Sequence, residues 1–179
     1  MIKLKKTTKR LNLINEIIKK MKEHDIFSES VSRKTNTENM IQKSVFSMLD
    51  KRLPEIISKN YGITERNARK QIKYNFIFES KTIKPVPSFN FFATNHRPDA
   101  ILELRDIRIA FEIKKGEKGN SIRSGIGQSI VYSTQYDFVL YFFVDTTPGC
   151  DINSSKHGDK EKELIKYLWD NYNIRFFVV

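Results

Sequence analysis

The sequence of 179 residues contains a single cysteine, Cys150, so it can form neither an internal disulfide nor a zinc site built from several cysteines. Glycine and proline are scarce, at seven and five residues, which predicts few long loops. Long apolar runs are missing as well, and neither end resembles a signal peptide or a membrane-spanning segment. We therefore expect a soluble, cytoplasmic protein without a membrane partner.

The remaining composition is that of a folded protein. Hydrophobic residues make up 39% of the chain and charged residues 30%, and there are thirteen phenylalanines and seven tyrosines. This apolar side-chain area is enough for a core, which excludes a disordered chain. The length predicts one compact domain, with room for a terminal appendage.

Positive charge is concentrated in the first half of the chain. The formal net charge is +11, and residues 1–80 carry 18 basic against 9 acidic side chains, compared with 14 against 12 in residues 81–179. Such a distribution favours a polyanionic partner, because each neutralised phosphate releases bound counterions. We expect DNA, although a basic surface can also serve solubility alone.

The N-terminal segment has the pattern of a basic helix followed by a linker. Apolar residues at helical spacing, separated by lysine and arginine, predict an amphipathic helix over 9–24. Residues 25–36 are polar and irregular, as in a linker. We therefore divide the chain into a basic helical arm, 1–34, and a core, 35–179.

Two further helices are expected next. The first of them begins near 35–38 and ends at Gly62, with Pro54 opening or kinking its continuation, and Thr64 can cap the second. The pair resembles a helix-turn-helix over 58–73, although any two amphipathic helices joined at a glycine give this pattern. Its basic residues, for which phosphate contact is the simpler role, are Arg66, Arg69 and Lys70.

From residue 99 onward, strands and helices alternate. Strands over 99–104 and 107–114 are separated by only two residues, which predicts an antiparallel hairpin. The later elements are a helix over 122–135, a strand over 138–144, a helix over 159–172 and a strand over 175–179. Apolar strands that alternate with helices predict an α/β fold with a mixed central β-sheet flanked by helices.

The hairpin brings together residue types suited to phosphodiester hydrolysis. Asp99 begins its first strand and Glu112 lies near the end of the second, so the two carboxylates can meet at one end of the hairpin. A hard divalent cation needs carboxylates from two such elements. Lys114 lies on the same strand face as Glu112, where it can orient or help to deprotonate water and stabilise charge on the phosphate. The alternative is an ordinary solvated pair of charges on an edge strand.

Pro98-Asp99 followed by Glu112-Ile113-Lys114 resembles the motif of the PD-(D/E)XK nuclease superfamily, which includes restriction endonucleases and Holliday junction resolvases. The order of the expected elements over residues 38–179 is similar to that family as well. The resemblance implies a restriction-endonuclease-like fold and Mg²⁺ held by Asp99, Glu112 and the carbonyl of Ile113, with Mn²⁺ as a substitute. It also implies that Lys114 is the catalytic lysine.

Three more positions match patterns in that family. Glu38 corresponds to an acidic residue on the first core helix that faces the metal site, although Thr35-x-x-Glu38 would also be a capping box. Gln128 and Tyr132, one helical turn apart, resemble a motif of exonuclease-like members. There Gln128 would approach the site and Tyr132 the nucleic acid, but an exposed amphipathic helix gives the same spacing.

The loop after the motif, rich in glycine, offers a grip for phosphates or is simply a solvated connection. Its basic residues are Lys115, Lys118 and Arg123. The chain is thus predicted to be a Mg²⁺-dependent DNA endonuclease that hydrolyses phosphodiester bonds. The alternative is a non-catalytic DNA-binding protein or regulator that keeps a nuclease-like fold. One site per chain cuts one strand at a time, so a double-strand break would need a homodimer.

Overall fold

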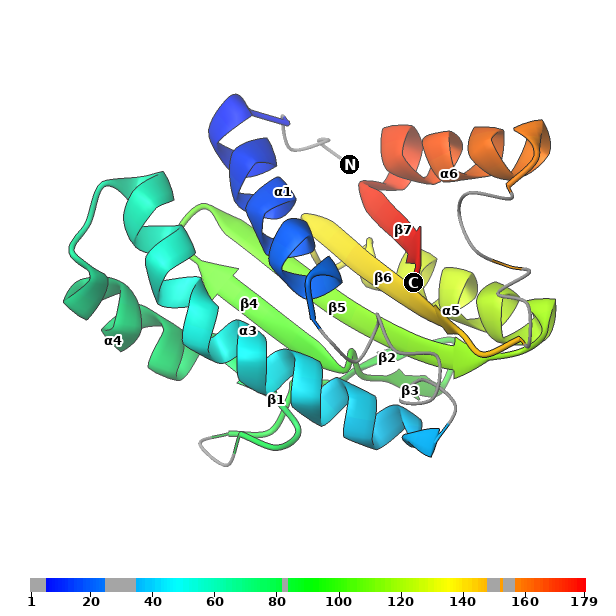
Figure 1. Ribbon diagram of the computed structural model, residues 1–179, viewed down its shortest axis with the longest axis horizontal. Coiled ribbons are helices and arrows are strands. Elements are labelled where there is room, and N and C mark those ends of the chain that lie inside the picture. Colours follow the sequence, from blue (N-terminus) through cyan, green and yellow to red (C-terminus); the bar gives the residue numbers. More distant parts are fainter. Residues whose placement is uncertain (1–5, 25–34, 82–83, 148–151, 153–156) are drawn as a thin grey trace.

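The computed structural model describes residues 6–24, 35–81, 84–147, 152 and 157–179, and most of the linker expected over 25–36 lies outside the described residues. The elements in chain order (Figure 1) are α1 (Thr8–Lys22), α3 (Glu38–Tyr61), α4 (Glu65–Asn75), β1 (Phe76–Phe78), β2 (Phe89–Phe91), β3 (Thr94–His96), β4 (Ala100–Leu104), β5 (Ile107–Gly116), α5 (Gly119–Tyr132), β6 (Phe138–Asp145), α6 (Asp159–Tyr172) and β7 (Ile174–Val178). Among the described residues, no helix combines the length and apolar character needed to cross a bilayer.

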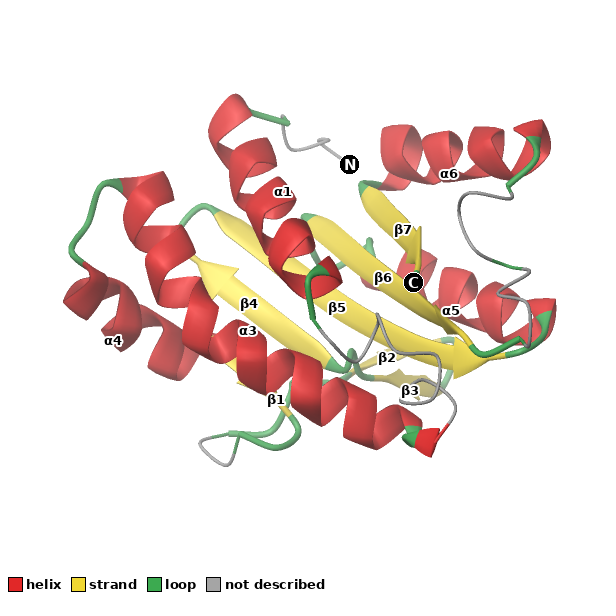
Figure 2. Cartoon of the chain, viewed as in Figure 1, coloured by secondary structure: helices red, strands yellow, loops and turns green. Residues whose placement is uncertain are grey.

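A mixed five-stranded sheet forms the centre of the molecule, and helices cover both of its faces (Figure 2). The strand order is β1-β4-β5-β6-β7, in which β4 is antiparallel to β1 and β5, whereas β5, β6 and β7 run parallel. Helices α1, α3 and α4 pack on one face, and α5 and α6 on the other. The α/β class with a mixed sheet flanked by helices is confirmed.

The β4–β5 hairpin has the predicted register. Leu104 pairs with Ile107 across a two-residue turn. On β5, Phe111 enters the core beneath α1 and α3, whereas its neighbour Ala110 packs on the opposite face of the sheet. By the same alternation, Glu112 lies on the α5 side.

Helix α1 packs into the main core and does not stand apart as an arm. Leu13 and Ile17 are fully buried in the cluster that also contains α3 and the sheet. Part of the basic surface of α1 faces protein as well, since Lys22 lies 4.4 Å above the ring of Phe177. The described part of segment 1–34 therefore belongs to the same body as the rest of the chain.

Helix α3 runs through Pro54 as one helix, so the proline is an internal residue rather than the start of a new element. Gly62 follows with a left-handed φ of 66° and ends α3 as predicted. The hydroxyl of Thr64 accepts the N–H of Asn67 and caps α4, again as predicted. Gly62 and Thr64 thus correctly mark the C-terminal end of α3 and the N-terminal end of α4.

One hairpin has no counterpart among the sequence predictions. Strands β2 and β3, which follow β1 and precede β4 along the chain, form a separate two-stranded sheet. The two-residue turn Phe92-Ala93 joins them. Helix α5 also begins at Gly119, earlier than expected, so the loop after the motif is shorter than predicted. Both features lie next to the residues that carry the motif.

Candidate active site

Strand β5 continues past the start of β4, which leaves the backbone at its end without a strand partner on that side. Asp99, just before β4, takes this place. Its Oδ2 accepts a 2.7 Å hydrogen bond from the N–H of Ile113, and its own N–H donates to the carbonyl of Phe111. The carboxylate of Asp99 therefore lies at the end of β5, where the motif is.

Two side chains of α3 bind the rest of this open edge. Gln42, which is buried, donates from Nε2 to the carbonyl of Ile113 at 3.2 Å. Glu38 accepts the N–H of Lys115 with Oε2 at 3.0 Å. These bonds satisfy backbone groups that a neighbouring strand would otherwise satisfy. Sequence reasoning missed Gln42, although its place one helical turn after Glu38 puts it on the same helix face.

Helix α3 is capped by Thr37, whose hydroxyl accepts the N–H of Met40. Glu38 is consequently the first residue of the helix, and its two carboxylate oxygens contact Lys114 and Lys115. The capping box that begins at Thr35 is therefore not what starts this helix.

Lys114 lies between two carboxylates. Its Nζ is 2.9 Å from Oε1 of Glu112 and 3.4 Å from Oε1 of Glu38. Burial lowers the pKa of Lys114, but the charges of Glu112, Asp99 and Glu38 outweigh burial and raise the pKa above its ordinary value. These charges favour the ammonium form of Lys114, which can bind an anionic oxygen.

The pKa values of the two buried carboxylates, Asp99 and Glu112, are both raised. Burial and then the charge of Glu112 raise the pKa of Asp99, against the Ile113 N–H and Lys114, which lower it. For Glu112, burial is the largest influence and raises the pKa, the charge and hydrogen bond of Lys114 lower it, and the net shift is upward. Both groups are therefore costly to keep ionised when no cation other than Lys114 is near.

Two buried oxygens, one in the motif and one on α5, make no hydrogen bond of good geometry among the described residues, although the Tyr132 hydroxyl lies close enough to the Glu112 carboxylate to lower the pKa of Glu112. One is Oε2 of Glu112, a side chain only 1% exposed, and the other is Oε1 of Gln128. Buried polar atoms in folded proteins are almost always bonded, so such orphans call for an explanation. A bound cation or water would satisfy an oxygen of this kind.

Tyr132 is buried beside the site, so the expected contact with nucleic acid is not available to it. The side chain is 1% exposed, and its hydroxyl donates to the carbonyl of Arg97 at 3.0 Å. Burial and then the charges of Glu112 and Asp99 raise its pKa, which keeps the phenol protonated. Because Arg97 is two residues before Asp99, this bond helps to position the carboxylate.

Helix α5 approaches the sheet unusually closely at Gly125. A Cβ added here would lie 2.3 Å from the ring of Tyr141, which pairs with Glu112 across β5 and β6. Only glycine allows this approach. It brings α5, which carries Gln128 and Tyr132, against the strand that carries the motif.

The basic residues next to the motif differ in their surroundings. Lys115 donates from Nζ to the carbonyl of Asn36 at 2.7 Å and thereby holds the chain at the start of α3. This contact gives Lys115 a structural task in addition to the phosphate contact predicted for it. Lys118 and Arg123 lie exposed at the beginning of α5, with Arg123 bonded to Asn120, and are open to a ligand.

The three basic residues of α4 lie apart from the carboxylates. Arg66, Arg69 and Lys70 are exposed, and Arg69 pairs with the exposed Glu65. Helix α4 follows the C-terminal end of α3, whereas Glu38 begins that helix (Figure 1). Helix α4 packs back along α3, and Arg69 lines the same small hollow as Asp50 and Pro54 of α3. Asp50 lies about 18 Å along α3 from Glu38, so one ligand can contact both places if it covers roughly half a turn of duplex DNA.

The oxygens at this end of the sheet suit a hard divalent cation. The carboxylates of Asp99 and Glu112 and the carbonyl of Ile113 are donor types that Mg²⁺ prefers. Within the described ranges, no three acidic, histidine or cysteine side chains already form a metal cage. Instead the ammonium of Lys114 lies between Glu38 and Glu112. The unpartnered Oε2 of Glu112 is the atom that a cation would satisfy directly.

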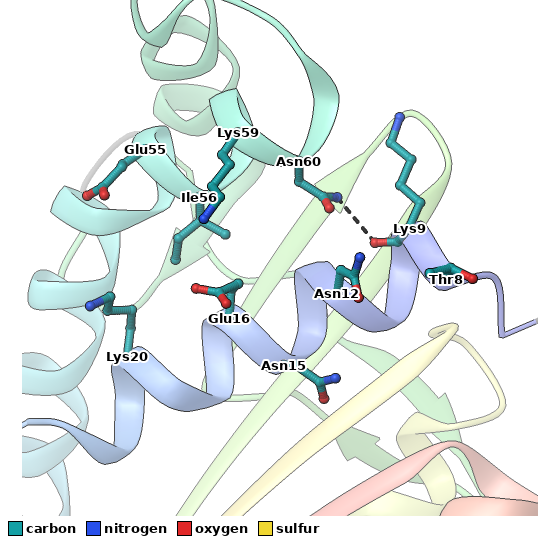
Figure 3. A pocket seen from close by; sticks show the side chains of 10 residues that line it. All are labelled: Thr8, Lys9, Asn12, Asn15, Glu16, Lys20, Glu55, Ile56, Lys59 and Asn60. Carbon is teal, nitrogen blue, oxygen red and sulfur yellow. Dashed lines mark hydrogen bonds between the residues drawn. The ribbon is translucent and has the colours of Figure 1, made fainter.

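Two hollows adjoin α3. A groove of about 740 Å³ lies between α1 and α3 (Figure 3), and lysines and glutamates line it alike, among them Lys59 and Glu55. A smaller hollow of about 240 Å³ is lined by Asp99, Gln42 and the exposed Lys43, but not by Glu38 or Glu112. The smaller hollow therefore reaches the candidate site at Asp99, and the mixed charges of the larger groove point to no reaction.

Comparison of the chain with protein-family models, with curated proteins and with solved structures finds no match. Inferences about function therefore depend on the residues and contacts of this chain.

Proposed function

We propose that the protein is a divalent-metal-dependent DNA endonuclease with a restriction-endonuclease-like fold of the PD-(D/E)XK class. The observation that carries the proposal is the end of β5, where Asp99 and Lys114 lie beside Glu112 and its buried, unpartnered oxygen. A buried carboxylate with an unsatisfied oxygen is destabilising, so a purely structural site would avoid it. A site that binds a cation and a phosphate has a use for it.

Each residue of the site has a role that its contacts support. Asp99, Glu112 and the carbonyl of Ile113 would hold Mg²⁺, or Mn²⁺ in its place. The ion, when bound, neutralises phosphate charge and activates water. Lys114 supplies an ammonium group where negative charge develops on the phosphate. Glu38 keeps Lys114 in place from the opposite side of the motif.

Residues outside the carboxylate cluster would bind and orient DNA. On the α5 side, Gln128 presents an oxygen to the reacting water or the ion. Lys118 and Arg123 would contact phosphates next to the site. The further basic group, on α4, consists of Arg66, Arg69 and Lys70.

The charge distribution supports DNA as the substrate and internal cleavage as the reaction. A net charge of +11, with basic groups spread along the length of α3, fits a stretch of duplex DNA beside the site. Cleavage of both strands would require two copies of the chain, because each has one site. A DNA substrate and a single cysteine both agree with a location in the cytoplasm.

Incubation with DNA of defined form tests the proposal. Closed circular, linear, branched and single-stranded DNA are each treated with Mg²⁺, Mn²⁺ or EDTA. We expect closed circles to be cut with either metal, no cutting in EDTA, and no cutting by Glu112→Ala under any condition. Cleavage by purified Glu112→Ala would overturn the site. Binding of DNA without cleavage in both metals would favour the alternative, a non-catalytic DNA-binding protein or regulator.

A further inference from the structure

The turn of the β2–β3 hairpin holds its two central residues in an unfavourable backbone conformation. Phe92 and Ala93 have φ angles of 48° and 57°, in the left-handed region. Two-residue hairpin turns with positive φ ordinarily contain asparagine, aspartate or glycine at these positions, because other side chains are strained there. A phenylalanine at such a place weakens the turn, and strain of this kind is found most often at functional positions.

Phe92 is also 91% exposed, more than any other large hydrophobic side chain in the described residues. Behind it, the ring of Phe91 contacts Phe92 edge-on at 4.7 Å and His96 edge-on at 6.2 Å between centroids. His96 stacks on Phe89 at 6.0 Å, and Phe89 packs edge-on against Tyr132 at 6.3 Å. A continuous row of rings therefore connects the buried wall of the candidate active site to an exposed tip.

The hairpin is joined directly to the strand that carries the first carboxylate. Only Arg97 and Pro98 separate β3 from Asp99, and the carbonyl of Arg97 is held by Tyr132. Phe92 precedes Asp99 by so few residues that the two cannot be more than about 24 Å apart. Figure 2 shows the hairpin near the end of β5 that carries the motif. DNA that occupies the site is thus within reach of the exposed ring.

A nucleobase fits this tip better than an apolar protein surface. The chain is strongly basic, and the side chain of Arg97, at the foot of the hairpin, is 52% exposed with only a 3.6 Å contact to Glu79. Aromatic rings with neighbouring cations bind single strands by stacking on the bases while the cations contact the backbone. In an intact duplex the base faces are already stacked, so a ring can enter only by unstacking a base step at a cost in free energy, whereas an unpaired base offers a free face.

We propose that Phe92 stacks on an unpaired base of the DNA, so that the preferred substrates contain a gap, a flap or a junction rather than continuous duplex. The inference rests on the proposed function, because it assigns a substrate class to the same site. It explains why the turn keeps a strained phenylalanine where asparagine would be more stable. The row of rings from Tyr132 to Phe92 would then hold the exposed ring at a fixed position relative to the carboxylates of the site.

The test uses the full-length protein and a duplex with a short single-stranded gap, with 2-aminopurine at successive gap positions and EDTA to prevent cleavage. Phe92→Asn is the informative variant, because asparagine accepts a left-handed φ and keeps the turn. Phe92→Trp restores a stacking ring. Tyr167→Asn, which removes another exposed aromatic side chain on α6, is the matched control.

We expect the wild-type protein to change the fluorescence of one gap position. Phe92→Asn should abolish this change and weaken binding to gapped DNA about five- to a hundredfold, the range for loss of one base-stacking ring. Its thermal stability should be kept or raised. Phe92→Trp should restore both signals, and Tyr167→Asn should alter neither. Equal affinity of the wild type and Phe92→Asn for gapped DNA would overturn the inference.

Failure of this inference and failure of the proposed function give different results. Cleavage by the wild type, together with no effect of Phe92→Asn on gapped DNA, would leave the nuclease and remove the stacking role. A fluorescence change in the gap without cleavage in Mg²⁺ or Mn²⁺ would keep the stacking role of Phe92 and overturn the proposed nuclease activity. If Phe92→Asn changed self-association while its binding to gapped DNA stayed the same, the tip would be a contact with a second copy, and the inference would be wrong.

Discussion

The carboxylate of Asp99 replaces a missing strand partner for Ile113. Its Oδ2 accepts the Ile113 N–H at 2.7 Å, just beyond the last β4–β5 pair, Ala100 with Phe111. The bond ties the first acid of the motif to the residue whose carbonyl would complete a cation site. Removing the charge of Asp99 and removing the bond therefore have different consequences, which different substitutions can separate.

Asp99→Asn should abolish cleavage and stabilise the metal-free protein. Asparagine keeps an oxygen for the Ile113 N–H but removes a charge that burial and Glu112 disfavour. The free energy of unfolding is therefore expected to rise. Denaturant unfolding in EDTA measures it, with the exposed Glu163→Gln as control. If Asp99→Asn lost as much stability as Asp99→Ala, the ionised carboxylate of Asp99 would not be destabilising in the folded protein, and the prediction would be wrong.

The metal-free protein should become more stable as the pH falls from neutral toward mild acid. Folding raises the pKa values of Asp99 and Glu112, so the folded state binds protons more tightly than the unfolded state. Their stabilising contribution is complete below the unfolded pKa and is lost as the pH rises through the folded pKa. Mg²⁺ prefers the ionised groups, so the rise in Tm that it causes should grow with pH.

Thermal unfolding between about pH 5 and pH 8, with EDTA or with Mg²⁺, measures both trends. Asp99→Asn serves as the control, because it removes one of the two titrating groups and should flatten the dependence in EDTA. A Tm in EDTA that falls steadily on acidification, equally in the wild type and the variant, would contradict the prediction.

The hairpin that carries the motif could be predicted because local rules determine it. Two residues between strands permit only a tight antiparallel turn, and alternation along a strand then assigns Glu112 and Lys114 to one face. Gly62 and Thr64 mark helix ends for equally local reasons, since one adopts a left-handed φ and the other caps a free N–H.

The rest of the site depends on contacts that no local pattern encodes. Gln42 bonds the carbonyl of Ile113, 71 residues away, and only the packing of α3 on β5 brings them together. The spacing of Tyr132 from Gln128 is also found on exposed amphipathic helices, yet the close approach of α5 to the sheet at Gly125 buries Tyr132. The β2–β3 hairpin escaped prediction because Phe92-Ala93 lacks the residues that normally identify a left-handed turn.

Gln42→Met should weaken cleavage through the orientation of the Ile113 carbonyl. Methionine fills a similar volume but does not donate, so a buried carbonyl loses its partner at a cost of about 1–3 kcal/mol. Loss of a partner that orients a metal ligand typically lowers metal affinity about 10–100-fold. We therefore expect the Mg²⁺ concentration for half-maximal cleavage to rise by that factor, with DNA affinity nearly unchanged.

Mg²⁺ titrations of the cleavage rate, beside unfolding curves, separate this role from a structural one. Gln71→Met, at an exposed position of α4, is the control and should change neither quantity. If Gln42→Met loses stability but keeps the Mg²⁺ dependence of the wild type, Gln42 only supports the fold.

Glu38→Gln and Glu38→Ala should differ in stability and agree in activity. Glutamine keeps an acceptor for the Lys115 N–H, so the free energy of unfolding should stay within about 0.5 kcal/mol of the wild type. Alanine removes the acceptor and should cost about 1–3 kcal/mol. Both remove a charge that holds Lys114, so cleavage should fall at least about tenfold and need more Mg²⁺. Full activity of Glu38→Gln at limiting Mg²⁺ would leave Glu38 a structural role only.

Neutralising Arg66, Arg69 and Lys70 together should weaken the salt dependence of DNA binding. These α4 side chains are exposed, and each phosphate contact contributes roughly one unit to the slope of log affinity against log salt. The triple variant should therefore lose up to about three units of slope. Fluorescence anisotropy with a labelled duplex over a range of salt concentrations measures the slope.

The matched triple lies on α1 and consists of Lys19, Lys20 and Lys22. Lys22 lies over the ring of Phe177, and Lys20 pairs with Glu23 at 2.9 Å. These contacts leave less charge available to DNA, so the α1 triple should change the slope less than the α4 triple does. An unchanged slope in both triples would move the DNA contacts to the second half of the chain.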